Sequence, residues 1–165
     1  MPKQLRTYLS GGMEYAKNEG MNWRKEMETW ITSELGHSVF NPNFESEKYL
    51  KKTLPGENLR SLKFSDIDRF RRIVRGIVKL DSREIALRSD YVVCYWDVSA
   101  QRGAGTKGEL SLARYFNKPV YIVTQMRVEN IPGWILGCSS GIFRSFAELK
   151  EYLRKKYMNS TRGRS

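Results

Sequence analysis

Histidine and cysteine are scarce in this sequence, and their scarcity excludes several kinds of active site. There is a single histidine, His37, so neither a serine–histidine–aspartate triad nor a histidine-based metal site can be assembled. The two cysteines, Cys94 and Cys138, lie in or beside apolar stretches without metal-ligand spacing. We therefore expect two buried free thiols, no disulfide framework and no bound metal.

Long apolar runs are also lacking. No stretch approaches the roughly 20 residues that a membrane helix needs, so we expect no membrane partner. The start of the chain, residues 1–5, has no apolar segment ending in small residues, which makes the cytoplasm the expected location. A length of 165 residues corresponds to one ordinary domain. We assign residues 1–153 to that domain and residues 154–165 to a basic tail that we expect to be flexible.

Acidic residues are outnumbered, with 18 against 29 basic residues and a net charge of +11. The excess is local: residues 154–165 carry five bases and no acid, and residues 60–88 carry nine bases and four acids. A charged tail and one basic helix face usually form solvated surface. Nucleic-acid binding is thus the less favoured partner prediction, while attraction of an anionic small substrate fits the same charge.

Short β-prone segments alternate with helical patterns along the chain. Asn22 is expected to cap the first helix, Ser65 or Asp66 a long helix toward Arg88, and residues 97–105 are expected to form a loop. The expected strands are residues 5–9, 39–40, 91–96, 119–123 and 141–143; the expected helices are 22–35, part of 44–62, 65–88, 106–116 and one from about 145. This alternation predicts a three-layer α/β fold with a five-stranded parallel sheet.

Ligands of open parallel sheets bind beyond the carboxyl ends of the strands, which directs attention to residues 8–13, 97–109 and 124–134. The stretch 103–109 is rich in glycine but lacks the spacing of a nucleotide-triphosphate phosphate loop. It allows close approach of the backbone to a ligand and places Glu109 in the first turns of a helix. There the helix dipole should favour the ionised, nucleophilic carboxylate by up to about 1 kcal/mol. The alternative is a surface glutamate that only complements the dipole.

Asp81 is the second unusual carboxylate. If the helix from Asp66 is unbroken, then Phe70, Val74, Ile77 and Asp81 form one stripe, because they follow each other at steps of four, three and four residues. An acid on an apolar face is costly unless a partner or a function retains it. The alternative is that Asp81 caps a new helix after a break at Leu80.

Several motifs in order resemble the nucleoside 2-deoxyribosyltransferase family and its deoxynucleotide N-hydrolase relatives. They are Tyr8 to Gly12 after the first strand, Asp81 before residues 89–93, residues 105–110 with Ala113, and residues 117–120. The resemblance spans residues 5 to about 125. It implies a flavodoxin-like (Rossmann-like) sheet, a homodimer or higher oligomer whose active sites borrow a residue from the neighbour, and no metal or organic cofactor.

By this resemblance Glu109 is the nucleophile that attacks the anomeric carbon, Asp81 is the acid/base that assists the departing base, and Tyr8 orients the nucleophile. Two carboxylates with distinct roles are also what retaining glycosyl transfer requires. The sequence departs from the family in two places. Asp81 precedes Asp90 by nine residues instead of eight, and Gly103 stands where relatives often have a polar side chain, so Ser99, Arg102 or backbone amides would take its task.

The predicted function is cleavage of the N-glycosidic bond of a (deoxy)nucleoside or nucleoside 5′-monophosphate through a glycosyl–glutamate intermediate. Transfer to another base (a transferase) and transfer to water (a hydrolase) both stay open. The alternative is a non-catalytic basic module that binds nucleotides or nucleic acid. We further hypothesise that 5′-monophosphates are preferred; the alternative is a plain nucleoside. The residues predicted to bind substrate are Ser10, Gly11, Gly12, Asp97, Arg102, Gly103, Gly105 and Thr106.

Overall fold

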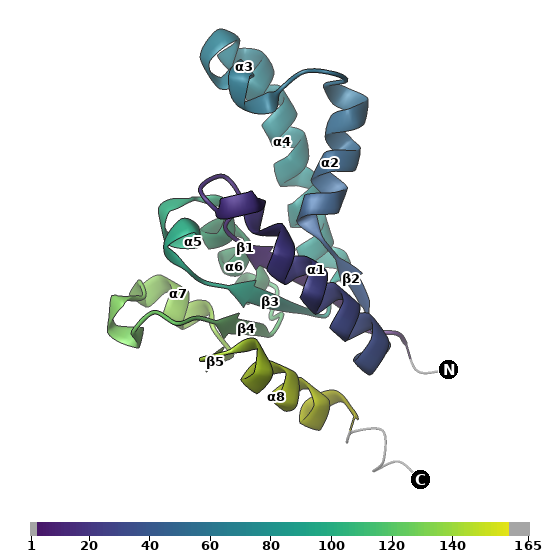
Figure 1. Cartoon of the computed structure of the whole chain (residues 1–165), viewed down its shortest axis with the longest axis vertical. Coiled ribbons are helices and arrows are strands. Elements are labelled where there is room, and N and C mark those ends of the chain that lie inside the picture. The colour runs from purple at the N-terminus through teal and green to yellow at the C-terminus, as the bar shows by residue number, and fades with distance from the viewer. Residues whose placement is uncertain (1–2, 159–165) are drawn as a thin grey trace.

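The computed structural model describes residues 3–158 and contains one sheet of five parallel strands in the order β2-β1-β3-β4-β5 (Figure 1). The strands are β1 (Arg6–Gly11), β2 (Ser38–Phe40), β3 (Tyr91–Tyr95), β4 (Val120–Val123) and β5 (Gly141–Phe143). The predicted fold class is confirmed. The order reverses between β1 and β3, so the crevice beyond their carboxyl ends is where a ligand of this fold is expected.

Helices cover both faces of the sheet. One face packs on α1 (Met21–Trp30), η2 (Ile31–Leu35) and α8 (Phe146–Met158) through a buried apolar cluster. The opposite face packs on the second layer through a cluster that includes Tyr8, Phe40, Ile85 and Trp96. That layer contains α4 (Ile67–Arg83), η3 (Glu84–Arg88), α5 (Val98–Arg102), α6 (Gly105–Tyr115) and α7 (Gly133–Cys138). Two short 3-10 turns, η1 (Lys17–Gly20) and η4 (Val128–Asn130), lie in the connections that follow β1 and β4.

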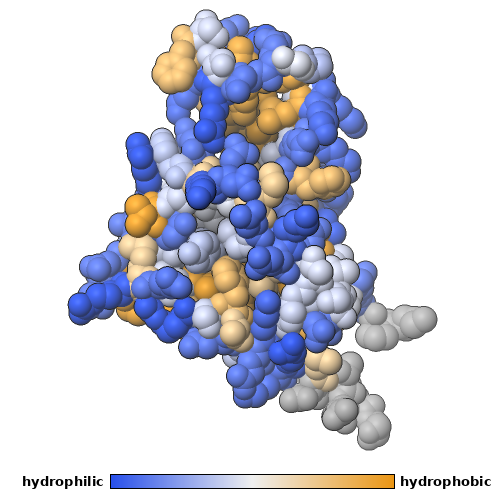
Figure 2. Space-filling view, in the orientation of Figure 1, coloured by the Kyte–Doolittle hydropathy of each residue, from blue (hydrophilic) through white to orange (hydrophobic). Residues whose placement is uncertain are grey.

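Three helices form an arm that projects away from the sheet (Figure 1). These are α2 (Pro42–Thr53), α3 (Leu59–Ser65) and the first part of α4. The arm has its own apolar cluster around Leu54, Leu62 and Ile73, and apolar atoms are visible between its helices in Figure 2. The surface loop predicted within residues 44–62 therefore contains the beginning of a helix. From the arm, α4 runs back to the sheet, and Asp81 lies in this last part of the helix.

Three local predictions need correction or qualification. Asn22 does not cap α1, because Gly20 in the left-handed conformation stands at the N-cap and Asn22 instead accepts a hydrogen bond from Asn18. The predicted loop 97–105 contains the short helix α5. Residues 154–158, predicted as part of a flexible tail, continue α8, whose buried Leu149 and Leu153 anchor it; residues 159–165 lie outside the described residues. The predicted cap at Asp66 is confirmed, since its side chain accepts from the backbone of Arg69.

Candidate active site

Three predicted site residues meet between β1 and α6. Tyr8 and Ser10 are alternate residues of β1, so both side chains point to the face covered by α6. The Tyr8 hydroxyl donates to Oε1 of Glu109 at 2.9 Å, and the Ser10 hydroxyl donates to Oε2. Ser10, predicted to contact substrate, thus contacts the candidate nucleophile. Together the two hydroxyls fix the orientation of the Glu109 carboxylate.

Asp81 joins this group from α4. The helix runs unbroken from Ile67 to Arg83, so Asp81 lies on the apolar stripe and does not cap a new helix. Its Oδ1 is buried and has no hydrogen-bond partner among the described residues. Burial and the negative charge of Glu109 raise the pKa of Asp81 to about 8, and the Tyr8 hydroxyl and the Arg24 charge oppose the shift. Asp81 is therefore protonated at neutral pH, as a general acid must be.

The unusual nine-residue spacing between Asp81 and Asp90 has a structural counterpart. Between them, η3 is a π-turn in which the backbone N–H of Ser89 donates to the carbonyl of Glu84 at 2.9 Å. This bond spans five residues instead of the four of an α-helix, so the turn contains one extra residue. The extra residue is absorbed locally, and Asp81 still faces Tyr8 and Glu109.

The surroundings of Glu109 shift the pKa of its carboxyl in opposite directions. Burial raises the pKa of its carboxyl, while the hydrogen bonds from Ser10 and Tyr8 and the charge of Arg24 lower it. The sequence predicts control of the ionisation of Glu109 by the helix dipole, but Glu109 lies beyond the first turn of α6 and burial dominates instead. The two hydroxyls and Arg24 are what favours the ionised nucleophile.

Arg24 is the site residue that the sequence argument missed. Its side chain is 1% exposed, and its guanidinium donates to the carbonyls of Leu9 at 3.2 Å and Gly11 at 2.7 Å. It also donates to the carbonyl of Glu19 at 3.1 Å and to Asn43 Oδ1 at 3.3 Å. A buried cation thus holds the turn after β1 and stands in the field of Glu109 and Asp81.

A signal for Arg24 was present in the sequence. Arg24, Met27 and Ile31 follow each other at helical steps of three and four, and all three are buried. A charged residue on an apolar stripe is the same signal that identified Asp81. Applied to every helix, it also identifies Glu84, one turn after Asp81 and 2% exposed.

The turn after β1 contains two of the glycines predicted to bind substrate, Gly11 and Gly12. A Cβ on Gly12 would lie 2.0 Å from Ser99 Oγ and 2.9 Å from the backbone nitrogen of Ala100, so α5 packs directly against this turn. A Cβ on Gly11 would lie 2.8 Å from the Trp23 ring. Close packing alone therefore requires glycine at both positions.

We expect Gly12→Ala to destabilise the protein by about 1–3 kcal/mol, because the new methyl group cannot fit beside α5. The matched control is Gly108→Ala in α6, where a Cβ has no atom within 4 Å. That control should be neutral or slightly stabilising. Urea unfolding of the two variants measures the difference, and equal unfolding free energies would contradict the packing argument.

The other predicted binding residues lie in or beside α5 and at the start of α6. Asp97 caps α5, accepting from the backbone N–H of Ala100 at 2.9 Å, which gives it a structural task. The exposed Arg102 guanidinium lies 4.3 Å from the centroid of the Tyr15 ring. Gly103 links the two helices. Gly105 and the buried Thr106 form the first turn of α6, ahead of Glu109.

A cavity of about 210 Å³ opens at the topological switch point. It is lined by residues after β1, among them Gly12, Lys17 and Trp23, by Tyr95 at the end of β3 and by Asp97 after it. Tyr8, Asp81 and Glu109 are not among its lining residues. These three residues therefore lie outside the cavity, and Lys17 is the cation in its lining.

Within residues 3–158, no cluster of three or more histidine, cysteine or acidic side chains could hold a metal ion. No helix in this part of the chain is both long and apolar enough to cross a bilayer. Cys94 and Cys138 are buried free thiols, as predicted.

Comparison with known proteins bears on the fold. No family model matches the chain, and no curated protein matches its sequence at a significant level. Among solved structures, the chain is similar to the CMP N-glycosidase BcmB of Clostridium botulinum, with a TM-score of 0.50 and 18% sequence identity over 90% of this chain and 97% of that chain. At this identity the match shows a shared fold. The fold that the family resemblance implied is thereby confirmed.

Proposed function

We propose that this protein cleaves the N-glycosidic bond of a nucleotide or nucleoside through a covalent intermediate on Glu109. The observation that carries the proposal is the pairing of two carboxylates in different environments. Glu109 is oriented by two hydroxyl donors, whereas Asp81 has a buried unpaired oxygen and a pKa raised to about 8. A nucleophile beside a protonated acid is the arrangement that retaining glycosyl transfer uses.

The proposed reaction has two steps. A Glu109 oxygen attacks the anomeric carbon while the bond to the base nitrogen breaks, and Asp81 gives its proton to the departing base. Water or a second base then attacks the anomeric carbon, the bond to Glu109 breaks, and the Asp81 carboxylate takes up the proton. Tyr8 keeps its own proton, because burial raises its pKa well above the ordinary value, and it stays a hydrogen-bond donor throughout.

The direct test is a screen of nucleosides and 5′-monophosphates for free-base release, with and without an acceptor base. We expect release from at least one substrate and, after acid quenching, a glycosyl adduct on Glu109 by mass spectrometry. Faster release with an acceptor base would indicate a transferase, and indifference to it a hydrolase. Absence of release from every substrate would contradict the proposal.

A 5′-monophosphate is the substrate that we expect to be preferred. The net charge of +11 and the likeness of the fold to a CMP N-glycosidase support this choice. Two cations are the candidates for the phosphate contact: Arg102 on α5, which the sequence indicated, and Lys17, which lines the cavity beside Gly12. A charge-assisted hydrogen bond contributes roughly 1.5–3 kcal/mol, so losing the right cation should cost about tenfold or more.

Specificity constants for a nucleoside and its monophosphate, measured in wild type, Arg102→Ala and Lys17→Ala, test this prediction. The variant that loses the phosphate contact should lose rate on the monophosphate and keep rate on the nucleoside. Equal constants for the two substrates in wild type would end the phosphate hypothesis. A preference unchanged in both variants would leave only the backbone amides of the glycine turns.

A further inference from the structure

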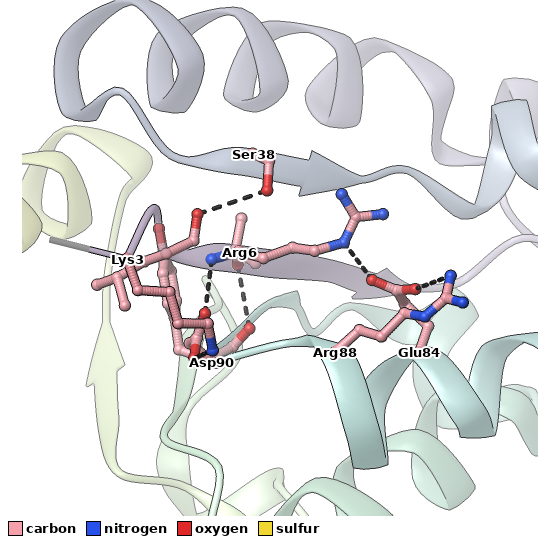
Figure 3. Close-up of polar contacts among 9 residues, drawn as sticks. Lys3, Arg6, Ser38, Glu84, Arg88 and Asp90 are labelled. Carbon is pink, nitrogen blue, oxygen red and sulfur yellow. Dashed lines mark hydrogen bonds and ion pairs between the residues drawn. The ribbon is translucent and has the colours of Figure 1, made fainter. Parts of the chain in front are cut away.

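The π-turn that precedes β3 is fastened to β1 at both of its ends by one residue, Arg6 (Figure 3). At the start of the turn, the Arg6 guanidinium donates to the Glu84 carboxylate. Beyond its end, the backbone N–H of Arg6 donates to Asp90 Oδ2 at 2.8 Å, and the Arg6 carbonyl accepts from the Asp90 N–H at 2.7 Å.

The contact at the start of the turn is an ion pair that is largely withdrawn from water. The Glu84 side chain is 3% exposed and that of Arg6 is 32% exposed. Arg88 approaches the other Glu84 oxygen at 3.9 Å from the far end of the same turn. A carboxylate so deeply buried needs its cation, because loss of one partner leaves an uncompensated charge. The pair therefore holds Glu84 firmly against β1.

The Arg6–Glu84 ion pair also lies on the same face of the sheet as the candidate active site. Arg6, Tyr8 and Ser10 are alternate residues of β1 and point to the same face of the sheet. Tyr8 and Ser10 hold Glu109, and Arg6 holds Glu84, one helical turn after Asp81. One strand thus sets the positions of both candidate catalytic carboxylates relative to each other.

Because the π-turn contains one residue more than an α-helical turn, its attachment to β1 affects the orientation of Asp81. If the π-turn relaxed to regular α-helix, the helix before it would rotate by about 100° per residue and shift by about 1.5 Å. Asp81 would then turn away from Tyr8 and Glu109. The α-helical hydrogen bonds that would replace the π-type bond are normally the more favourable ones, so contacts outside the turn are needed to hold it.

We infer that Arg6 is a positioning residue that aims Asp81 by fastening both ends of the π-turn to the strand that holds Glu109. The inference rests on the proposed function, in which Asp81 protonates the departing base. It assigns Arg6 no contact with the substrate. It predicts that loss of the Arg6–Glu84 pair impairs the proton transfer specifically.

The kinetic test compares Arg6→Met with the matched control Arg83→Met, an exposed arginine of the same helix region. Arg6→Met should lower kcat about ten- to hundred-fold for a natural base, with KM unchanged, and far less for an activated base that leaves without a proton. Arg6→Lys keeps the charge and should recover part of the rate. An equal loss for both leaving groups would overturn the inference, as would full activity of Arg6→Met.

A second measurement does not depend on turnover. The double variant Arg6→Met with Glu84→Gln removes the pair without leaving a buried charge, so it should fold, which circular dichroism checks. NMR of ¹³C-labelled aspartate then follows Asp81, assigned by its loss in Asp81→Asn. The groups that act on the pKa of Asp81 are Glu109, Tyr8, Arg24 and Glu84, and the first three are unchanged. The single variant Glu84→Gln, whose amide oxygen can still accept from Arg6, measures what loss of the Glu84 charge alone does to the Asp81 titration.

If Asp81 turns toward solvent in the double variant, its titration midpoint should fall from about 8 toward the ordinary value of 3.8. A midpoint no lower than that of Glu84→Gln alone would overturn the inference even if the protein releases no base at all. Conversely, a lowered midpoint in a protein without glycosidase activity would refute the proposed function and leave the role of Arg6 intact. The two failures are therefore distinguishable.

Discussion

Glu109→Gln should abolish base release while leaving the fold intact. The amide keeps the size of the carboxylate, and its oxygen can accept from one of the two hydroxyls while its NH2 donates to the other, but it lacks the negative charge that attacks the anomeric carbon. Loss of a covalent nucleophile typically costs orders of magnitude, so we expect a decrease of about a thousandfold or more in kcat. Steady-state release of free base measures it.

The matched control is Glu151→Gln, an exposed glutamate of α8 whose side chain is 67% accessible and pairs with Lys155. This control should keep full activity. Glu109→Gln should also lose the glycosyl adduct in acid-quenched samples. Retention of more than about a tenth of the wild-type rate would count against nucleophilic catalysis by Glu109.

The sequence was sufficient to predict the parallel sheet and the two carboxylates beside it, Asp81 and Glu109. The strands are continuous apolar runs bounded by turn residues, and such local patterns survive in the structure because both faces of β1, β3 and β4 are buried. Asp81 was recognisable because it continues the apolar stripe of a long helical pattern, and the structure, in which α4 is unbroken, excludes the alternative of a cap after Leu80. Asp66 as its cap follows the same local rule.

What the sequence did not predict depends on contacts between distant segments. Arg24 meets carbonyls of β1 and η1 that no local pattern reveals, and the role of Ser10 follows from the proximity of β1 to α6. The helix α5 is five residues long, which is too short for a periodic signal, and the sequence therefore predicted a loop there. The residue donated by a neighbouring subunit and the oligomer itself stay predictions.

The pH dependence expected of base release follows from the same two carboxylates. Asp81 must be protonated to assist the departing base, and its pKa is raised to about 8. The rate on a natural base should therefore fall as the pH rises through about 8, because the acid loses its proton. Glu109 must be ionised, so the rate should also fall toward acidic pH.

Asp81→Asn should reduce release of a natural base by about 10²- to 10⁴-fold, because the amide cannot transfer a proton to the leaving group. An activated base needs no proton and should lose much less. The alkaline decrease in rate near pH 8 should disappear in the variant. An equal loss for natural and activated bases would instead make Asp81 structural.

The same substitution should have an opposite effect on stability, with a defined dependence on pH. The folded-state pKa of Asp81 lies near 8, above the ordinary value of 3.8, so between these values the native state holds a proton that the unfolded chain has released. The contribution of Asp81 to the free energy of unfolding of the wild type therefore decreases as the pH rises from about 4 to about 8. Asparagine does not titrate, so the variant lacks this contribution.

The difference in unfolding free energy between Asp81→Asn and wild type should consequently shift in favour of the variant across that interval. Urea unfolding of both proteins at pH 5, 6.5 and 8 measures the shift. Titrating groups whose pKa is the same in the two proteins contribute equally to both unfolding free energies, so their contributions cancel in the difference. A difference that is constant with pH would mean that Asp81 is ionised in the folded protein. It would then be a base or an electrostatic group, and the proton for the departing base would have to come from elsewhere.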